Sequence, residues 1–445
     1  MRSYVPNTEP ERQAMLKEIG LSETEELFSD IPRNLRLSRP LDLDKGKSEI
    51  EVRRIFKAFA ENCESSMPVF RGAGAYRHYI PSVVPKLSMH SAFYTAYTPY
   101  QPEMSQGMLQ AIFEYQTLIC QLTGMDASNA SVYDGATAAA ESMLMARDIK
   151  RRRKILYSAG LHPDVQETLK TYARFAGMQA VSVPLFKDGL TDREALVKEL
   201  KDSAGFILPV PNFYGLIENQ AEIADLVHEQ DGLLISYLNP ISLGLLKRPG
   251  DSGADIAIGE GQPLGMPLSY GGPYLGFMAC KAKFTRNLPG RISGETTDAD
   301  GNRAYVLTLQ AREQHIRRDK AASNICSNQM LCAITASIYL AVMGPGGLRE
   351  AAVQSTQKAH YLAEKISSVK GMRLRYPNTP FFNEFVVDSD RDAKKIDKLV
   401  KDRGLIGGLP LSYANKGDNG ILYCVTEMNS KSEMDTLISA LEVSK

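Results

Sequence analysis

The stretch DIAIGEGQPLGMPLSYGGPYLG, residues 255–276, has the pattern of a short buried strand, a polar turn and a glycine-rich loop. The turn offers a carboxylate, Glu260, and an amide, Gln262, on either side of Gly261. A lysine amine in such a turn could form an imine with a carbonyl compound, whereas an amide cannot. The stretch is therefore an active site, a site that lacks its key residue, or an ordinary loop.

A second group of polar side chains lies in YTAYTPYQPE, residues 94–103, which we call the tyrosine segment. It carries Tyr94, Tyr97, Tyr100 and Gln101 and shows little helical periodicity. Tyrosine rings can pack while their hydroxyl groups line a polar pocket. We expect this segment to form part of an interface, and the alternative is a proline-ordered loop whose rings cover the core.

Cations gather in residues 286–320, which we call the basic segment: Arg286, Arg291, Arg312, Arg317, Arg318 and Lys320. The acidic, glycine-containing stretch GETTDADGN between them predicts a hairpin-like flap. Arginine forks suit carboxylates of a substrate, a partner chain or an acidic carrier protein. Salt bridges across a subunit interface are an equal alternative, above all for Arg312 and Arg317. FRGAGAYRHY, residues 70–79, adds further cations without a defined role.

Composition excludes several classes of protein. Basic and acidic residues number 52 each, so the formal net charge is zero, which argues against a nucleic-acid-binding or membrane-surface protein. The six cysteines form no CxxC motif and the six histidines do not cluster. We therefore expect no metal site, no disulfide framework and a cytoplasmic location. No signal peptide or membrane-spanning run is expected.

The elements that must position these residues follow from the periodicity of the chain. Residues 1–68 are polar and helical in tendency and predict an N-terminal helical arm. Residues 69–335 alternate helices with short β-rich runs and predict a large α/β domain with a doubly wound, mostly parallel sheet. Residues 336–445 predict a small C-terminal α+β domain. This plan is that of fold-type I enzymes, which use pyridoxal phosphate (PLP).

Longer stretches of the sequence point to one family among these enzymes. FYTAYTPYQPEMSQGMLQAIFEYQT, NASVYDGATAAAE, VPNFYGLIE, DIAIGEGQPLGMPLSYGGP and LQAREQHIRRDKAASNICSNQ resemble the P-protein of the glycine cleavage system, glycine decarboxylase. They are similar to the half of that protein that does not carry the cofactor lysine. In bacteria that split the P-protein into two chains, this half is the alpha-type chain, or subunit 1. The resemblance covers nearly the whole length.

The resemblance implies that two cofactor positions are vacated here. In the catalytic chain a lysine precedes the glycine-rich loop, and Gln262 is its nearest counterpart. An acidic residue that keeps the pyridine nitrogen protonated should end an earlier strand, but LLISYLN offers Asn239 and no carboxylate. Lys247, Lys281 and Lys283 are alternative lysines, better explained as surface residues.

A phosphate cup is the third part that PLP needs. VYDGATAAAES places Gly135, Ala136 and Thr137 at a helix start, where free N–H groups could bind an anion. An ordinary capped turn is the preferred interpretation. His162, in the sequence HPD, is expected at another helix start as a structural residue.

What this chain contributes also follows from the resemblance. A beta-type partner would hold PLP and its lysine, with no cofactor bound covalently here. This chain would complete the wall of that site with Tyr94, Tyr97, Tyr100, Gln101, Arg291, Arg312 and Arg317. A heterotetramer, glycine as substrate and the lipoyl H-protein as acceptor are implied. Two alternatives stay open: a self-sufficient PLP-dependent aminotransferase or lyase, and a non-catalytic scaffold of the same fold.

Overall fold

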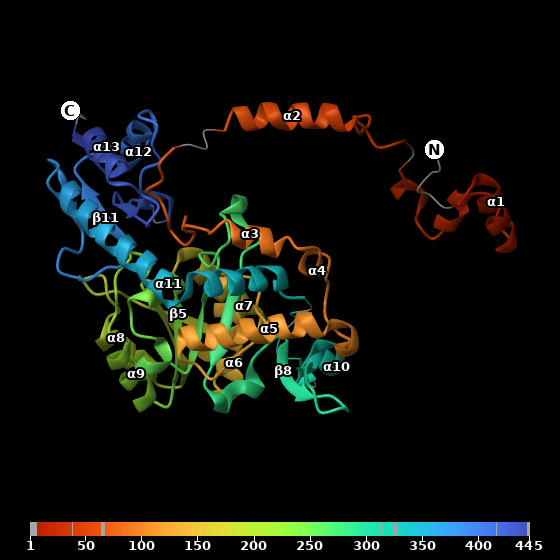
Figure 1. Ribbon diagram of the computed structural model, residues 1–445, viewed down its shortest axis with the longest axis horizontal. Coiled ribbons are helices and arrows are strands. Elements are labelled where there is room, and N and C mark those ends of the chain that lie inside the picture. The colour runs from red at the N-terminus through yellow and green to blue at the C-terminus, as the bar shows by residue number, and fades with distance from the viewer. Residues whose placement is uncertain are drawn as a thin grey trace. The chain divides into compact units, whose positions relative to one another are not determined.

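The computed structural model describes residues 7–37, 39–63, 67–310, 313–321, 323, 325, 327–414 and 416–442. The chain divides into two units, Met1–Ser65 and Ser66–Lys445, which are described one at a time (Figure 1).

The first unit contains two α-helices, α1 (Glu9–Glu18) and α2 (Glu49–Glu61). A capping box starts α2, because the Ser48 N–H donates to the Glu51 carboxylate at 2.8 Å. Phe56 and Phe59 of α2 pack edge to face yet stay exposed. Among the described residues of this unit only Leu16 is buried, so it lacks a core of its own. Its boundary lies three residues before the end of the predicted arm.

The second unit is built on a seven-stranded sheet with the order β1-β7-β6-β5-β4-β2-β3. Strands β2 to β6 pair in parallel, and β7 and β1 are antiparallel at one edge. The fold is α/β with a mostly parallel sheet, as predicted. The strands are β1 (Ala127–Ser128), β2 (Lys154–Ser158), β3 (Gln179–Val183), β4 (Ser203–Val210), β5 (Leu233–Leu238), β6 (Ile256–Glu260) and β7 (Gly276–Cys280).

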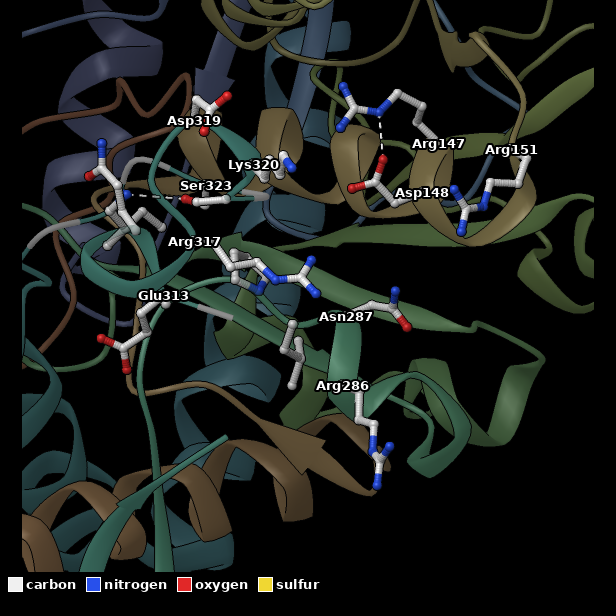
Figure 2. Close-up of a pocket in the computed structure, with 16 residues that line it drawn as sticks. Arg147, Asp148, Arg151, Arg286, Asn287, Glu313, Arg317, Asp319, Lys320 and Ser323 are labelled. Atoms are coloured by element: carbon white, nitrogen blue, oxygen red, sulfur yellow. Dashed lines mark hydrogen bonds and ion pairs between the residues drawn. The ribbon is translucent and has the colours of Figure 1, made fainter. Parts of the chain in front are cut away.

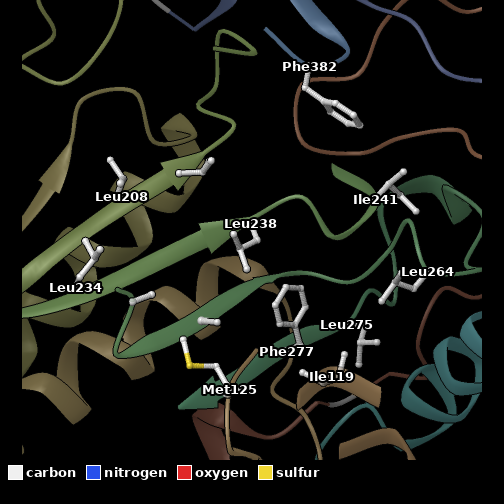
Figure 3. Packing of buried hydrophobic residues seen from close by; sticks show 14 of the residues in the cluster. Ile119, Met125, Leu208, Leu234, Leu238, Ile241, Leu264, Leu275, Phe277 and Phe382 are labelled. Atoms are coloured by element: carbon white, nitrogen blue, oxygen red, sulfur yellow. The ribbon is translucent and has the colours of Figure 1, made fainter. Parts of the chain in front are cut away.

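Helices cover both faces of this sheet because its strands are apolar on both sides. Leu208 and Leu234 pack into one cluster of buried side chains, while Ile207 and Ile235, one residue away along each strand, pack into another. Figure 3 shows the first cluster, which Ile119 joins from a neighbouring helix. The helices of this part are α3 (Val83–Ser88), α4 (Ser91–Tyr94), α5 (Pro102–Thr123), α6 (Gly135–Lys150), α7 (Pro163–Phe175), α8 (Arg193–Leu200) and α9 (Gln220–Glu229).

A hairpin follows the large sheet where the flap was predicted. Strands β8 (Ile292–Thr297) and β9 (Arg303–Thr308) pair antiparallel, and their turn is closed by Asp298, which accepts hydrogen bonds from Asp300 and Asn302. The hairpin packs against α5 through Tyr305 and Leu109. The short helix α10 (Gln314–Arg317) comes next.

The C-terminal part has a four-stranded antiparallel sheet in the order β10-β11-β13-β12. The long helix α11 (Met330–Ser367) spans the predicted boundary at 335/336 and is interrupted at Gly344, where φ is 59°. It is the one described helix that is long and apolar enough to cross a membrane by length and composition, but this break leaves 14 residues before it. Fourteen residues reach roughly 21 Å, short of a bilayer core. The other elements are β10 (Met372–Leu374), β11 (Glu384–Ser389), α12 (Ala393–Lys401), β12 (Leu409–Pro410), β13 (Ile421–Cys424) and α13 (Lys431–Glu442).

Candidate functional site: a filled cofactor turn and an exposed tyrosine surface

Glu260 occupies the anion position at the start of α6. Its Oε2 accepts a hydrogen bond from the Gly135 N–H at 3.0 Å, and its Oε1 accepts from Gln262 and Leu275 at 2.9 and 3.1 Å. Burial raises the pKa of this carboxyl to about 7, and the three N–H donors oppose that rise. A carboxylate of the chain itself thus holds the place where a helix N-terminus would bind a phosphate.

The predicted cup at Gly135, Ala136 and Thr137 has a second internal occupant. Asp134 caps α6 by accepting from the Thr137 N–H and the Thr137 hydroxyl, both at 2.7 Å. Two of the three amides therefore bind side chains of this chain. These contacts are those of a capped turn, the preferred interpretation.

Gln262, the predicted counterpart of the cofactor lysine, is 1% exposed, and its side-chain oxygen and nitrogen both make hydrogen bonds. Its Oε1 accepts from the Tyr76 N–H at 2.9 Å, and its Nε2 donates to the carbonyls of Tyr76 and Met266 at 3.0 and 2.7 Å. The side chain therefore ties the backbone of Tyr76 to the turn. The amide serves as a structural tie at the position where the resemblance predicts an amine in the catalytic chain.

Asn239, at the position expected for the acid, caps the turn that follows β5 by accepting from Ile241 at 3.0 Å. Its Nδ2 is buried and has no hydrogen-bond partner among the described residues. It faces a residual cavity of about 50 Å³, shared with Tyr76, Tyr237 and Glu260. Sites for cofactors and drug-sized ligands occupy roughly 300–1,000 Å³. With no lysine, no acid and an internal carboxylate in the cup, these residues do not fit PLP.

A second buried carboxylate binds the same loop, which includes Tyr76. Glu384 on β11 accepts from the Ala73 N–H and the Tyr76 hydroxyl, both at 2.7 Å. Burial raises its pKa to about 7. The loop of residues 71–79, which had no assigned role, thus joins the small domain to the filled turn. Arg71 adds an ion pair with Asp397 at 2.5 Å.

The alternative lysines lie away from the turn. Lys281 and Lys283 approach Asp255 at 4.0 and 3.7 Å. Asp255 precedes β6, whereas Glu260 ends that strand, so both lysines are at its opposite end. Lys247 is exposed on the chain between β5 and β6. None of the three is placed to act as a cofactor lysine in this turn.

The tyrosine segment and the basic segment meet on one surface. The Arg291 guanidinium donates to the Tyr100 hydroxyl at 2.9 Å and lies 5.0 Å from the centre of its ring. The Tyr97 hydroxyl is 3.1 Å from Ser327 Oγ. Arg291 is buried, but Tyr94, Tyr97 and Tyr100 are 57%, 77% and 53% exposed. Gln101 is exposed too, directly before α5.

The remaining predicted residues do not join this surface. Arg317 is exposed at the end of α10, and Arg312 lies outside the described residues. His162 is a helix cap, as expected: its Nδ1 accepts from Asp164 at 3.1 Å, and its Nε2 is 2.9 Å from the Ala73 carbonyl.

Sequence reasoning missed the roles of Glu260 and Glu384. A usable signal existed for Glu260, because it stands between Gly259 and Gly261 at the end of an apolar strand. A charged residue there must be buried and requires donors. Glu384 gave no comparable signal, since its partners Ala73 and Tyr76 are more than 300 positions away.

Comparison with known proteins agrees with this geometry. The sequence pattern of the glycine cleavage system P-protein matches residues 2–441. The chain is 49% identical to a probable glycine dehydrogenase (decarboxylating) subunit 1 of Desulfitobacterium hafniense over 99% of both chains. It is 51% identical to the protein of the same name from Moorella thermoacetica, also over 99% of both.

Solved structures extend the comparison to the fold. A crystal structure of glycine decarboxylase (P-protein) of the glycine cleavage system, in inhibitor-bound form, superposes with a TM-score of 0.90 at 41% identity and 99% coverage of both chains. The Burkholderia pseudomallei sphingosine-1-phosphate lyase, at 15% identity and a TM-score of 0.65, shares the fold over 92% of this chain and 94% of its own. The match of the family pattern and these full-length similarities show that the chain belongs to the P-protein family of the glycine cleavage system.

Proposed function

We propose that this chain is the cofactor-free subunit of a glycine dehydrogenase (decarboxylating). The complex would decarboxylate glycine and pass the aminomethyl group to the lipoyl group of H-protein. A beta-type partner would hold PLP and its lysine. The observation that carries the proposal is the Glu260 carboxylate at the N-terminus of α6, with Gln262 tied to residues 73–79.

The tyrosine segment is the part of this chain that we assign to the partner's site. Its three tyrosines are more than half exposed, which is costly for aromatic rings unless another surface covers them. Arg291 holds Tyr100 through a hydrogen bond and a ring contact, so the hydroxyl is oriented before any partner arrives. Exposed rings on an oriented backbone suit a shared wall that excludes water and positions polar groups.

The absorption spectrum of the purified chain with added PLP tests the cofactor assignment. We expect no imine band from this chain alone and a band once the beta-type chain is added. Glycine–bicarbonate exchange should need both chains. An imine band from this chain by itself, removed by borohydride reduction of one of its lysines, would show instead that it is a self-sufficient enzyme.

The scaffold alternative requires a different measurement. A scaffold would bind the beta-type chain and leave the rate of exchange unchanged. Titrating this chain into a fixed amount of the beta-type chain should raise the exchange rate to saturation at equal subunit numbers. A flat titration, with binding confirmed by ultracentrifugation, would favour the scaffold.

A further inference from the structure

A cavity of about 450 Å³ opens beside the C-terminal half of α6, away from the filled turn (Figure 2). We call it the basic cavity. Its walls come from α6, from residues 286–290 and from described residues of the stretches 313–321, 323 and 325. The volume is that of a site for a small molecule. Five cations and three carboxylates line it, a net charge of +2: Arg147, Arg151, Arg286, Arg317, Lys320, Asp148, Glu313 and Asp319.

Two of the cations have a structural explanation. Arg147 pairs with Asp148 at 2.7 Å. Arg147 and Arg151 also lie at the end of α6, where positive charge complements the carbonyl end of the helix dipole. With Arg147, Arg151 and Asp148, the α6 side of the cavity carries a net charge of +1.

Arg286, Arg317 and Lys320 have no such explanation. None of them makes an ion pair with a carboxylate among the residues that the structure describes. Figure 2 shows the Arg317 guanidinium projecting into the opening between α6 and Asn287, whereas the carboxylates of Glu313 and Asp319 and the guanidinium of Arg286 point away from it. Arg317 and Lys320 line the same cavity and repel each other, and a bound anion would relieve that repulsion.

Buried hydrogen bonds hold both segments that carry these cations. Asn129, 0% exposed, donates to the Pro289 carbonyl at 2.9 Å. Ser323 donates to Glu141 at 3.0 Å, and Glu141 is 4% exposed on α6. Burial raises the pKa of Glu141 to about 7. The cavity walls are therefore anchored to the interior of the domain, so the site is preorganised.

We propose that the basic cavity binds a small, multiply charged anion of the phosphate class, with Arg317 and Lys320 as its main contacts and Arg286 at the rim. A guanidinium fork matches the oxygens of a phosphoryl group in pairs, and an ammonium adds a point charge. These cations, in a cavity of net positive charge, suit a compact ligand such as a diphosphate better than a single carboxylate. This site is independent of the cofactor assignment, because it lies at the other end of α6 from Glu260.

Calorimetric titration of the full-length chain with inorganic pyrophosphate, at constant ionic strength, tests the site. We expect saturable binding at one site per chain and weaker binding of inorganic phosphate. Arg317→Gln and Lys320→Gln should each weaken pyrophosphate binding about tenfold, and Arg286→Gln should weaken it less. Arg174→Gln is the matched control, because Arg174 is an exposed arginine on α7 that lies over Phe175 outside the cavity.

Three outcomes would overturn the site. One is the absence of saturable binding, and another is an equal loss in the Arg174 control. The third appears when the titration is repeated with the beta-type chain present. If that chain abolishes pyrophosphate binding and the Arg286 and Arg317 variants weaken subunit association, the cavity is a subunit contact. The PLP absorption spectrum is unaffected by any of these results, so they leave the proposed function to its own test.

Discussion

The filled turn, residues 260–262, and the tyrosine segment differ in how far their side chains are exposed. In the turn, Glu260 and Gln262 are buried and their hydrogen bonds are made within this chain. In the tyrosine segment, Arg291 is buried but the tyrosines around it are exposed. Unpaired buried polar groups are costly, and in the turn they are satisfied within this chain. In the tyrosine segment the rings of Tyr94, Tyr97 and Tyr100 stay more than half exposed, as the proposed shared wall requires.

Removing the Glu260 carboxylate should have the largest effect. Glu260→Ala leaves the amides of Gly135, Gln262 and Leu275 without an acceptor, at about 1–3 kcal/mol each before any water enters. We expect a loss of about 4 kcal/mol in the free energy of unfolding, measured by urea denaturation. Glu260→Gln should lose less, because its carbonyl oxygen can keep two of the bonds. Glu194→Ala, at an exposed position on α8, should be neutral; a similar small loss for both alanine variants would contradict an internal anion.

Glu384 should make stability depend on pH in a direction opposite to that of a paired surface carboxylate. Burial raises its pKa from 4.5 to about 7, so the native state keeps a proton that the unfolded chain has lost between these pH values. Unfolding then releases a proton, and stability falls as pH rises through this window. The free energy of unfolding changes by about 3 kcal/mol across this window, at about 1.36 kcal/mol for each pH unit.

The variant Glu384→Gln isolates this effect, since its amide is neutral at every pH and can still bond to Ala73 and Tyr76. The difference in unfolding free energy between wild type and variant should move in favour of the variant from pH 5 to pH 8. Denaturant titrations at four pH values measure it. A constant difference would mean that the carboxyl ionises as freely in the folded state as in the unfolded one.

Arg291 should matter to the complex more than to the chain. Arg291→Ala releases Tyr100, and we expect glycine–bicarbonate exchange by the mixed subunits to fall at least about tenfold, or about 1.4 kcal/mol in barrier height. Tyr100→Phe keeps the ring contact and should fall less. The exposed cation over an aromatic ring at Arg174 serves again as control. Equal exchange rates in all variants, with intact subunit binding, would remove the tyrosine segment from the site.

The last substitution, Gln262→Lys, is expected to have no effect on imine formation with PLP. Gln262→Lys restores an amine to the turn, but Glu260 still occupies the Gly135 amide and the residual cavity is about 50 Å³. We expect no imine absorption when PLP is added to this variant. An imine band would show that the missing lysine alone separates this turn from a cofactor site.

Much of the fold follows from local patterns. Apolar runs such as ADIAIG mark buried strands, and helices between them require parallel crossovers. That Gln262 and Asn239 are vacated cofactor positions follows from the resemblance and stays a prediction, whereas their burial and hydrogen bonds are seen in the structure. The hairpin at 292–308 followed from the turn chemistry of its loop.

The contacts that define the candidate site could not be predicted in this way. Glu260 reaches Gly135, 125 positions away, and Arg291 reaches Tyr100, 191 positions away. Such pairs depend on strand order and on the angle at which loops leave the sheet, and neither leaves a trace in local periodicity. Helix α11 shows the same limit, since a helix that crosses a predicted domain boundary has no local signal to mark it.

The ties around Gln262 have an evolutionary consequence. A chain that regained the lysine would lose the bonds to Tyr76 and Met266 before it gained any catalysis, and Glu260 would still block the phosphate position. Each single reverse substitution therefore loses stabilising hydrogen bonds, and only several substitutions made together lead to a turn that can bind the cofactor. If the partner chain holds the cofactor as proposed, the hydrogen bonds of the turn make that division of labour hard to reverse by single substitutions.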